Sequence, residues 1–559
     1  MIYEYIYLLY KRIFMKKQLL YISTILGLSV ASVYAEDVVV KSNSAQLSGG
    51  GKDFEVYYAG PSTSSPTIGL AGETYDVGCI TLKGAGLQVP GETEGVLSIN
   101  PAKEWYFKGD YNFDIATESG KKTIIKNESL KRFYYRAGTL TVLNSATPSQ
   151  EEGAVAPVAY FDLGSNTTSL MFNGDGQTIN VNINTDTEFV TTAENGGGTA
   201  FPIYIYNNVA FNIDGSTVTF DTNLRVGDGK TIPTISLVNG STMNTKKTLA
   251  FESGTLTVDE TSKLVIDKGS RFGKAGATSK ATVNIAGTLD MNAVLTVNEN
   301  AVITTKKFEH QNGSDLTVSG EFETQSATTF ANTIIKTGGI VKQTSTGGTK
   351  IARDFTVDGT FLTKGVLAVE AGSTDASDAK WATITINEGA NFYVDGKSDA
   401  GSAITLKNGE FVLNKKNAIT NSNGDAVQLV SVDKATNVIF RINESQEFKK
   451  IVAHTIGIKY YLGEDATDTL TAEFGSISNG KHIIYNFEEN RVFVLNDMTN
   501  PNDFFDAYYN VNGEYVKVDN LYINNGWLSA INSAVPEPAE WAMILGALAL
   551  GLAVYRKRK

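Results

Sequence analysis

The sequence is poor in the residues that form covalent cross-links and metal sites. Cys79 is the only cysteine among 559 residues, so the chain can form no intramolecular disulfide and no cysteine-based zinc or iron–sulfur site. The three histidines, His310, His454 and His482, are too few and too scattered to suggest a metal or catalytic cluster. The sequence therefore predicts a fold held together by packing, with no metal and no cofactor.

Positive charge is also scarce. The formal net charge of -12 argues against nucleic acid or anionic lipid as the main partner of the body of the protein, because both need a cationic surface. Hydrophobic residues make up 42% of the chain, which is enough for a real core and excludes wholesale disorder. The length suits about two to four domains, or one long solenoid.

A helical period is missing from residues 158–435. Short runs recur there instead, in which apolar residues alternate with Thr, Asn or Lys, and glycine turns separate them. Alternation at period two is the signature of a half-buried strand. The runs that we expect to be strands are 216–220, 255–258, 263–266, 281–285, 316–318, 355–357, 382–386, 403–406 and 411–413.

Such strands cannot bury their own apolar face, so they must stack in coils that share one core. The pattern resembles the right-handed parallel β-helix passengers of autotransporter adhesins. We therefore predict an all-β fold with a right-handed parallel β-helix-like repeat body at 158–435. A β-sandwich array is the alternative, favoured by Asn-Gly pairs because these form tight hairpins. The pairs that we considered are 173–174, 195–196, 239–240, 312–313, 408–409 and 423–424.

Two further β regions flank this body. Residues 36–157 contain short β-branched and aromatic runs, and we expect the aromatic groups 105–107 and 133–135 to pack in the core of this N-terminal region rather than form a sugar-stacking platform. Residues 436–530 are rich in Tyr, Phe, Asn and Asp. We expect this region to be a C-terminal cap, because an open β edge promotes aggregation. A separate ligand-binding module is the alternative.

The N-terminus has the layout of a secretory signal peptide. A cationic start at Lys16 and Lys17 precedes an apolar run, and small residues before Ala35 suit a cleavage site. We therefore predict a signal peptide over 1–35, cleaved after Ala35, with translation starting at Met15. The secretion translocon and signal peptidase are the implied partners.

The C-terminus carries a second targeting segment, over residues 535–559. It consists of Val535, Pro536, Glu537 and Pro538, then an apolar run at 541–555, and finally Arg556, Lys557, Arg558 and Lys559. The apolar run is somewhat short of the ~20 residues that span a bilayer as a helix. We nevertheless expect a single C-terminal transmembrane helix, with the basic end in the cytoplasm and the rest of the chain outside. A plain membrane anchor would have the same orientation.

These three parts, in this order, resemble the PEP-CTERM sorting signal of exported bacterial proteins. The resemblance implies processing by an exosortase-type membrane protease at or near Pro536, Glu537 and Pro538. It further implies a protein exported across the inner membrane, anchored by its tail before processing, and then held at the cell surface or in the extracellular matrix. This kind of tail has also been described on ice-binding proteins.

The body carries no recognisable catalytic motif, so we predict no catalytic, cofactor-binding or metal residues. Asp228 between two glycines fits a turn better than a calcium loop, and His454 fits a structural role on a strand. The leading hypothesis is a non-enzymatic, adhesin-like surface or matrix protein with a glycan or extracellular-matrix ligand. A polysaccharide lyase or glycoside hydrolase is the alternative. Ice binding is a third hypothesis, because of the resemblance of the tail. It would need a regular Thr-x-Thr ladder, and the pairs Thr139/Thr141, Thr255/Thr257 and Thr383/Thr385 occur with no constant period.

Overall fold

The computed structural model is almost entirely β-strand, and it divides into two compact units. Unit 1 comprises residues 1–268 and 276–282, and unit 2 comprises residues 269–275 and 283–559. The structure describes residues 36–40, 54–58, 67–68, 75–83, 94–99, 105–115, 122–127, 133–147, 156–163, 170–174, 176–191, 201–311, 313–370, 383–398, 401–431, 437–454, 458–475, 477, 480–532, 545–550 and 556–557.

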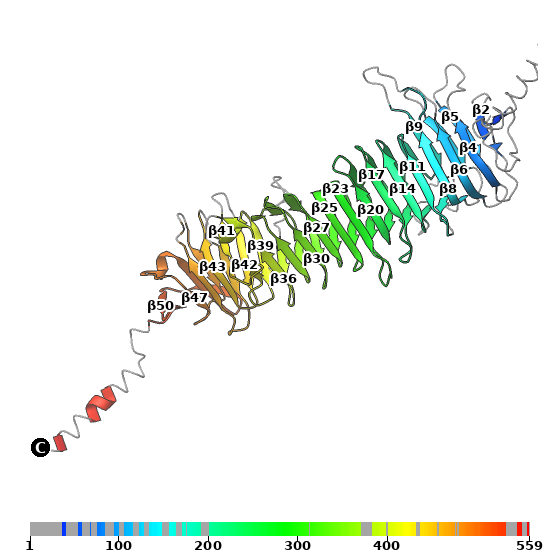
Figure 1. Cartoon of the computed structure of the whole chain (residues 1–559). Helices are drawn as coiled ribbons and strands as arrows, with labels where there is room; N and C mark the ends of the chain where they lie inside the picture. Colours follow the sequence, from blue (N-terminus) through cyan, green and yellow to red (C-terminus); the bar gives the residue numbers. More distant parts are fainter. Residues whose placement is uncertain are drawn as a thin grey trace, which may run out of the picture. The chain divides into compact units, whose positions relative to one another are not determined.

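Unit 1 contains a stack of coils with three strands each. Its coil strands are β10 (Leu170–Phe172), β11 (Ile179–Ile183), β12 (Thr187–Val190), β13 (Ile203–Ile205), β14 (Val209–Asp214), β15 (Thr217–Asp221), β16 (Leu224–Val226), β17 (Thr234–Val238), β18 (Thr242–Thr245), β19 (Leu249–Phe251), β20 (Gly254–Val258) and β21 (Lys263–Ile266). Each strand from β10 to β18 pairs in parallel with the strand three places later. Figure 1 shows β11, β14, β17 and β20 side by side.

The N-terminal part of unit 1 is also built from parallel strands. Its strands are β1 (Glu36–Val40), β2 (Phe54–Tyr58), β3 (Thr67–Ile68), β4 (Tyr75–Lys83), β5 (Glu94–Ile99), β6 (Trp105–Asp114), β7 (Lys122–Asn127), β8 (Phe133–Leu143) and β9 (Val158–Asp162). One stack runs β1, β2, β4, β6, β8, and a second runs β3, β5, β7, β9. Tyr134 and Tyr135 are buried, as expected for core aromatics.

The pairing period of the strands changes along unit 2. Its first strands are β22 (Ser270–Phe272) and β23 (Ala281–Met291), of which residues 283–291 belong to unit 2. The strands that follow are β24 (Leu295–Val297), β25 (Ala301–His310), β26 (Asp315–Val318), β27 (Glu321–Thr324), β28 (Thr328–Phe330), β29 (Asn332–Ile335), β30 (Ile340–Gln343), β31 (Thr349–Ile351), β32 (Phe355–Val357), β33 (Thr360–Thr363), β34 (Leu367–Val369), β35 (Thr383–Ile386), β36 (Asn391–Val394), β37 (Lys397–Ser398), β38 (Gly401–Leu406), β39 (Gly409–Leu413), β40 (Ile419–Thr420), β41 (Gln428–Ser431), β42 (Val438–Ile442), β43 (Gln446–Val452), β44 (Lys459–Leu462), β45 (Leu470–Phe474), β46 (His482–Tyr485), β47 (Val492–Val494) and β48 (Phe505–Val511). Unit 2 has a three-strand period from β26 to β33, and partners two strands apart before and after it, at β22–β25 and at β42–β46.

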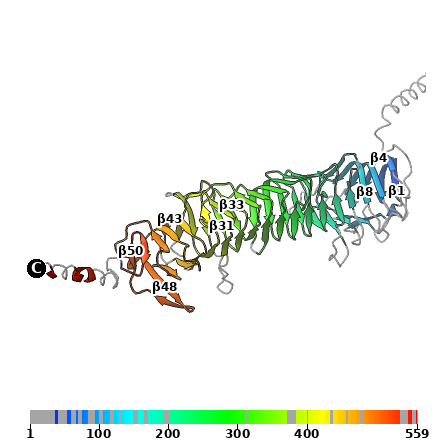
Figure 2. The same cartoon turned by 90° about the horizontal axis from the view of Figure 1, so that it is seen from below.

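From β26 to β33 each strand of unit 2 pairs in parallel with the third strand after it. From β42 to β46 the parallel partner is the second strand after it, so each coil there has two strands. Figure 2 shows β31 and β33 from the three-strand part and β43 from the part that follows.

Antiparallel hairpins close the C-terminal end of unit 2. β48 pairs with β49 (Glu514–Lys517), and β51 (Trp527–Ser529) pairs with both β47 and β50 (Tyr522–Asn524). Asn512-Gly513 and Asn525-Gly526 form the two hairpin turns with positive φ at both residues, the geometry for which Asn-Gly is favoured. A short 3-10 helix, Pro501–Asp503, precedes β48. Figure 2 shows the β48 hairpin projecting beside the coils.

The core of each unit consists of inward columns of apolar side chains. In unit 1, Val181, Phe211, Ile235 and Leu256 occupy equivalent positions and are at most 2% exposed. Each such side chain contributes about 1.5–3 kcal/mol by leaving water. In unit 2, an aromatic column of Phe411, Phe440 and Tyr460 stacks with ring centroids 4.7 and 6.0 Å apart.

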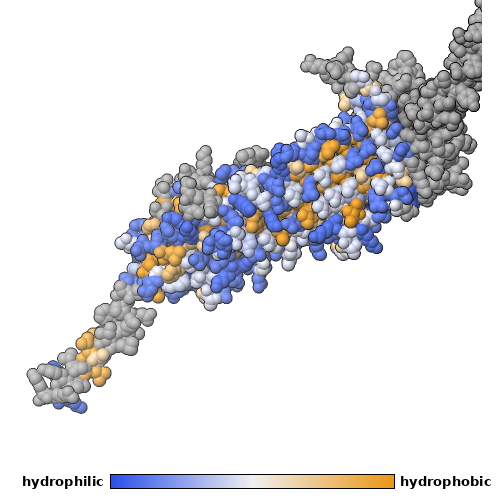
Figure 3. Space-filling model, viewed as in Figure 1, coloured by the Kyte–Doolittle hydropathy of each residue, from blue (hydrophilic) through white to orange (hydrophobic). Residues whose placement is uncertain are grey.

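These observations confirm the predicted all-β class and the parallel, solenoid-like stacking. All nine runs that the sequence marked as strands overlap observed strands. The β-sandwich alternative is wrong, because sandwich strands pair antiparallel, whereas the coil strands pair in parallel. The surface turned to the viewer in Figure 3 has hydrophobic groups interspersed among hydrophilic ones, as expected of strands with one buried and one solvated face.

The C-terminal tail is described only in part. Residues 545–550 and 556–557 are helical, and Leu545, Leu548 and Leu550 are exposed. In Figure 3 these two segments are hydrophobic and hydrophilic, respectively. Among the described residues, no helix combines the length and the apolar character that crossing a membrane requires.

Candidate binding surface

Most of the predicted targeting residues lie outside the described residues. This holds for Ala35, for the sorting motif Val535, Pro536, Glu537 and Pro538, and for Arg558 and Lys559 of the basic end. Arg556 and Lys557 are described, and they are helical and exposed. The site that the structure itself presents lies instead on the outer face of the last coils of unit 2.

A column of three tyrosines runs across that face. Tyr461 on β44, Tyr485 on β46 and Tyr508 on β48 are register partners, and all three point outward and are half-buried. Their rings stack with centroids 4.5 and 5.3 Å apart. These separations are close to the usual 4.7–4.9 Å between neighbouring strands, so the coils set the spacing of the rings.

The hairpin adds a fourth tyrosine to the column. Tyr515 on β49 lies opposite Asn510 of β48, which places it on the same face as Tyr508. Its ring meets Tyr485 edge-on at 4.7 Å and Tyr461 at 6.4 Å. We call Tyr461, Tyr485, Tyr508 and Tyr515 the tyrosine cluster. The Asn512-Gly513 turn is what brings the fourth ring to the other three.

Four cations surround the tyrosine cluster. Arg441 on β42 is the register partner of Tyr461, and its guanidinium lies 4.9 Å from the Tyr461 ring centroid. The same guanidinium is ion-paired with Glu410. Lys459 lies two residues before Tyr461 and therefore shares its face. Lys481 and Lys517 both reach Asp506, at 3.4 and 2.9 Å. We call Arg441, Lys459, Lys481 and Lys517 the cationic rim.

Amide side chains form a ladder on the coils before the cluster. Asn414 donates to Asn387 at 2.9 Å, and Asn443 donates to Asn414 at 2.7 Å. Asn510 donates in the same way to Asn486 at 3.2 Å. These repeating bonds hold neighbouring coils in register and place a line of amides near the tyrosine cluster.

The tyrosines of the cluster are suited to donate hydrogen bonds. Burial, together with neighbouring phenols, raises the pKa of Tyr461 and of Tyr485 above the usual value. Both hydroxyls therefore keep their protons at neutral pH. Within the part of the chain that the structure describes, no protein group forms a hydrogen bond with the four hydroxyls. Stacking occupies both ring faces of Tyr485, and Arg441 and Tyr485 cover those of Tyr461, so the ring edges and hydroxyls of these two residues are what remains for a ligand.

Unit 1 has an aromatic group of a different kind. Tyr204 and Tyr206 lie 5.4 Å apart, and Arg225 is the register partner of Tyr204. Arg225 is bound at 2.7 Å to Glu252, whose side chain is only 4% exposed. Burial raises the pKa of Tyr206 to about 12. The cation of this group is thus already paired with a buried carboxylate.

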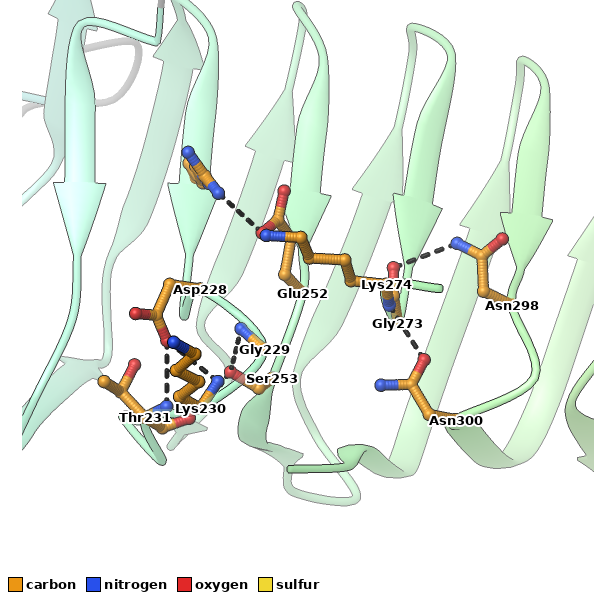
Figure 4. Close-up of polar contacts among 11 residues, drawn as sticks. Asp228, Gly229, Lys230, Thr231, Glu252, Ser253, Gly273, Lys274, Asn298 and Asn300 are labelled. Carbon is orange, nitrogen blue, oxygen red and sulfur yellow. Dashed lines mark hydrogen bonds and ion pairs between the residues drawn. The ribbon is translucent and has the colours of Figure 1, made fainter. Parts of the chain in front are cut away.

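The glycine-flanked Asp228 closes a turn at a corner of the coil. Asp228 accepts from the amides of Lys230 and Thr231, both at 2.9 Å, and so closes its own turn (Figure 4). Burial alone would raise the pKa of Asp228, but the hydrogen bonds from these amides lower it. In unit 2, Asn300 accepts from the Lys274 amide at 2.8 Å in a similar structural role (Figure 4). The turn interpretation is confirmed for Asp228.

The Thr-x-Thr pairs do not form one regular array. Thr139/Thr141 and Thr255/Thr257 share a sheet of unit 1, but the coils between them carry Asn180/Asn182, Ala210/Asn212 and Thr234/Ser236. In unit 2, Glu410 and Val412 follow Thr383/Thr385 at the next register positions. An ice-binding face needs a flat and regular threonine ladder, and neither unit has one among its described coils.

The histidines are placed differently from the sequence prediction. His454 follows the end of β43 and is exposed, so its predicted place on a strand is wrong. His310 and His482 are the buried histidines, and burial lowers the pKa of each to about 4. Each uses both ring nitrogens: His310 with Ser314 and Ala331, and His482 with Tyr460 and Gly475. Among the described residues, no three His, Cys, Asp or Glu side chains are grouped to hold a metal ion.

The sequence pointed to aromatics in this region but not to the arrangement. The four tyrosines and Arg441 all lie within the predicted aromatic-rich region 436–530, but the sequence gives no reason to group them. The signal lay in the alternation: Tyr460 and Ile484 are buried, so the residue after each must point outward. The coil register, which aligns the outward residues, was not visible in the sequence.

Comparisons with known proteins add no relative. No protein-family model, no curated protein and no solved structure matches this chain.

Proposed function

We propose that this chain is an exported, non-enzymatic, adhesin-like structural protein of the cell surface or extracellular matrix, which binds its ligand on the outer face of its coils. The observation that carries the proposal is the outward tyrosine cluster with its cationic rim, on a fold whose interior is occupied by apolar side chains. An outer face with donors aligned along the coils suits binding of an extended ligand.

Several features of the fold support an extracellular role. Stacked parallel coils are stabilised by core packing and by hydrogen bonds between coils, so the chain needs no disulfide outside the cell. Crossovers between parallel strands are almost always right-handed, which favours the right-handed form of the solenoid. The antiparallel hairpins after β47 cover the last coil and support the proposed cap within residues 436–530. The N-terminal region 36–157 and the body 158–435 remain proposed domain limits.

The tail supports the proposed route of sorting. We propose a signal peptide over 1–35, a transmembrane helix within 541–555, and cleavage near Pro536, Glu537 and Pro538 by an exosortase-type protease. The leucines of 545–550 are exposed, and they are followed by the cations Arg556 and Lys557. An apolar helix with a cationic end is oriented by the positive-inside rule.

The alternative, a polysaccharide-active enzyme, has less support. A glycosidase needs one carboxylic acid with a raised pKa beside a second carboxylate. Among the described residues, the carboxyl groups with a shifted pKa, Asp228, Asp259, Glu370 and Asp465, all shift downward. Glu410 and Asp506, the acids of the binding face, are each ion-paired with cations.

The test of sorting is to fractionate cells with and without the exosortase-type protease and to determine both ends of the protein by mass spectrometry. We expect the surface fraction to start at Glu36 and to lack Arg556–Lys559 only when the protease is present. An intact basic end in the wild-type surface fraction would refute processing. A protein found only in the cytoplasm would refute export.

A further inference from the structure

We propose that the tyrosine cluster and the cationic rim together bind a linear polysaccharide that carries carboxylate groups, a polyuronate. This inference deepens the proposed function, on which it rests for the extracellular setting, by naming the class of ligand. The residues concerned lie on the outer face between β42 and β49.

The two inner rings of the binding face, Tyr461 and Tyr485, offer hydrogen-bond donors rather than open ring faces. Tyr461 is sandwiched between Arg441 and Tyr485, and Tyr485 is stacked on both sides and met edge-on by Tyr515. A neutral sugar or a nucleic-acid base binds aromatic residues by lying on a free ring face. The inner rings of this column have no such face, so the ligand must instead accept hydrogen bonds from hydroxyl groups at the ring edges.

The charge of the face differs in sign from that of the whole chain. The face carries the four cations of the rim and two acids, Glu410 and Asp506, whereas the chain as a whole has a formal net charge of -12. The two acids show what the rim already recognises: Glu410 pairs with Arg441, and Asp506 is held by Lys481 and Lys517. An anionic ligand with carboxylates is therefore complementary to this face.

The donors repeat along the coils, which favours a polymer. The ring centroids of Tyr461, Tyr485 and Tyr508 are 4.5 and 5.3 Å apart, so the hydroxyls recur once per coil. A short or globular acidic ligand would meet only one or two of these positions. A linear chain lying across the strands can meet each coil in turn, with its carboxylates directed to the rim.

The test uses the purified full-length chain in mild detergent with polygalacturonate as the probe. Its fully methyl-esterified form is the matched control, because it has the same backbone without the charge. We expect binding of polygalacturonate that weakens roughly tenfold at high salt, as screening of exposed charges requires. We expect no measurable binding of the methyl ester. Equal binding of both forms would overturn the proposal.

Variants locate the site. The double variant Lys459→Gln, Lys517→Gln should weaken binding roughly tenfold, and Tyr485→Ala should do the same. Tyr485→Phe keeps the stacked ring and should weaken binding severalfold through loss of its hydroxyl. The double variant Lys246→Gln, Lys247→Gln in unit 1 changes the charge equally at exposed lysines and should bind like wild type.

The remaining outcomes are also decisive. Thermal unfolding of each variant separates loss of binding from loss of folding, and Tyr485→Phe covers the case in which Tyr485→Ala fails to fold. Stronger binding of dextran sulfate or single-stranded DNA than of polygalacturonate would overturn the choice of carboxylate. Binding in solution does not depend on cellular sorting. If the chain fails to bind polygalacturonate but its tail is processed normally, only this inference is refuted. If the chain binds polygalacturonate but its tail is not processed, only the sorting route is refuted.

Discussion

The outward side chains of the two units differ, although the inward side chains are apolar in both. In unit 1, the outward column on β11, β14 and β17 consists of Asn182, Asn212 and Ser236, joined by hydrogen bonds of 3.0 and 2.6 Å. In unit 2, the outward column on β44, β46 and β48 consists of stacked tyrosines. The inward neighbours are apolar in both. The difference teaches that inward columns determine the coil, while outward columns are free to carry function.

The largest expected effect comes from the inward columns. Phe211→Ala in unit 1 and Phe440→Ala in unit 2 should each lower the free energy of unfolding by about 3–5 kcal/mol, because each leaves a cavity in a fully buried stack. Their outward neighbours provide the controls: Asn212→Ala and Arg441→Ala should cost about 1 kcal/mol or less. Urea unfolding followed by circular dichroism measures both. Equal losses for inner and outer variants would break the comparison.

Acid should destabilise unit 2 before unit 1. The folded-state pKa of His310 and of His482 is about 4, below the ordinary value of 6.5, so the unfolded chain binds more protons between these values. The stability from neutral burial is therefore complete above pH 6.5 and falls as the pH drops toward 4. We expect a loss of about 1–2 kcal/mol per histidine by pH 5. All three histidines of the chain belong to unit 2.

The response of unit 1 to acid should come at lower pH. Burial alone would raise the pKa of Asp259, but hydrogen bonds from Ser262, Asn239 and Thr261 lower it to about 2 from 3.8. Its contribution is present above pH 3.8 and is lost as the pH falls toward 2. Limited proteolysis at pH 5 should therefore cut unit 2 first. The double variant His310→Gln, His482→Gln should flatten the pH dependence, and an unchanged slope would contradict the account.

Alanine substitutions at two glycines should distinguish a tightly packed corner from an open turn. Gly227 has φ +69°, and a Cβ there would collide with the backbone and hydroxyl of Ser253. Gly513 has φ +91°, with open space around the added atom. We expect Gly227→Ala to cost roughly 3 kcal/mol and Gly513→Ala about 1 kcal/mol, since only the first adds a clash to the backbone strain. Thermal unfolding of the two variants measures this, and a larger loss at Gly513 would reverse the argument.

The smallest expected effect concerns the asparagine ladder. Asn414→Ala removes two hydrogen bonds, to Asn387 and from Asn443, and should lower the free energy of unfolding by about 1 kcal/mol. Asn414→Asp keeps the acceptor for Asn443 but loses the donor to Asn387. It should therefore lose less stability than the alanine variant. Chemical denaturation of both variants gives the order, and the opposite order would argue against the ladder.

Local patterns sufficed to predict the strands, because alternation is a property of neighbouring residues. The runs 255–258 and 355–357, for example, correspond to β20 and β32. The register of the coils could not be predicted, since their hydrogen bonds join distant residues, for example 17, 20 and 31 positions apart, through turns of unequal length. Asn512-Gly513 and Asn525-Gly526 are local hairpin signals. They are not among the Asn-Gly pairs on which the sandwich alternative was based.

The candidate site was predictable only as a composition. The density of tyrosine after residue 436 indicated a specialised region, but Tyr485 and Arg441 enter the site through register alone. The buried histidines show the same limit. His454 has apolar neighbours in the sequence and is exposed, whereas His482 is buried because its coil places it against Tyr460 and Phe474.

The central claim, that inward side chains carry the fold and outward ones the binding, is tested most directly on two adjacent residues. Tyr460 is fully buried and Tyr461 belongs to the outward column. Stability and polygalacturonate binding are measured for Tyr460→Ala and Tyr461→Ala. We predict a loss of about 3–5 kcal/mol for the first. For the second we predict roughly tenfold weaker binding with stability within about 1 kcal/mol of wild type. Unchanged binding by Tyr461→Ala, or equal destabilisation by both variants, would contradict the claim.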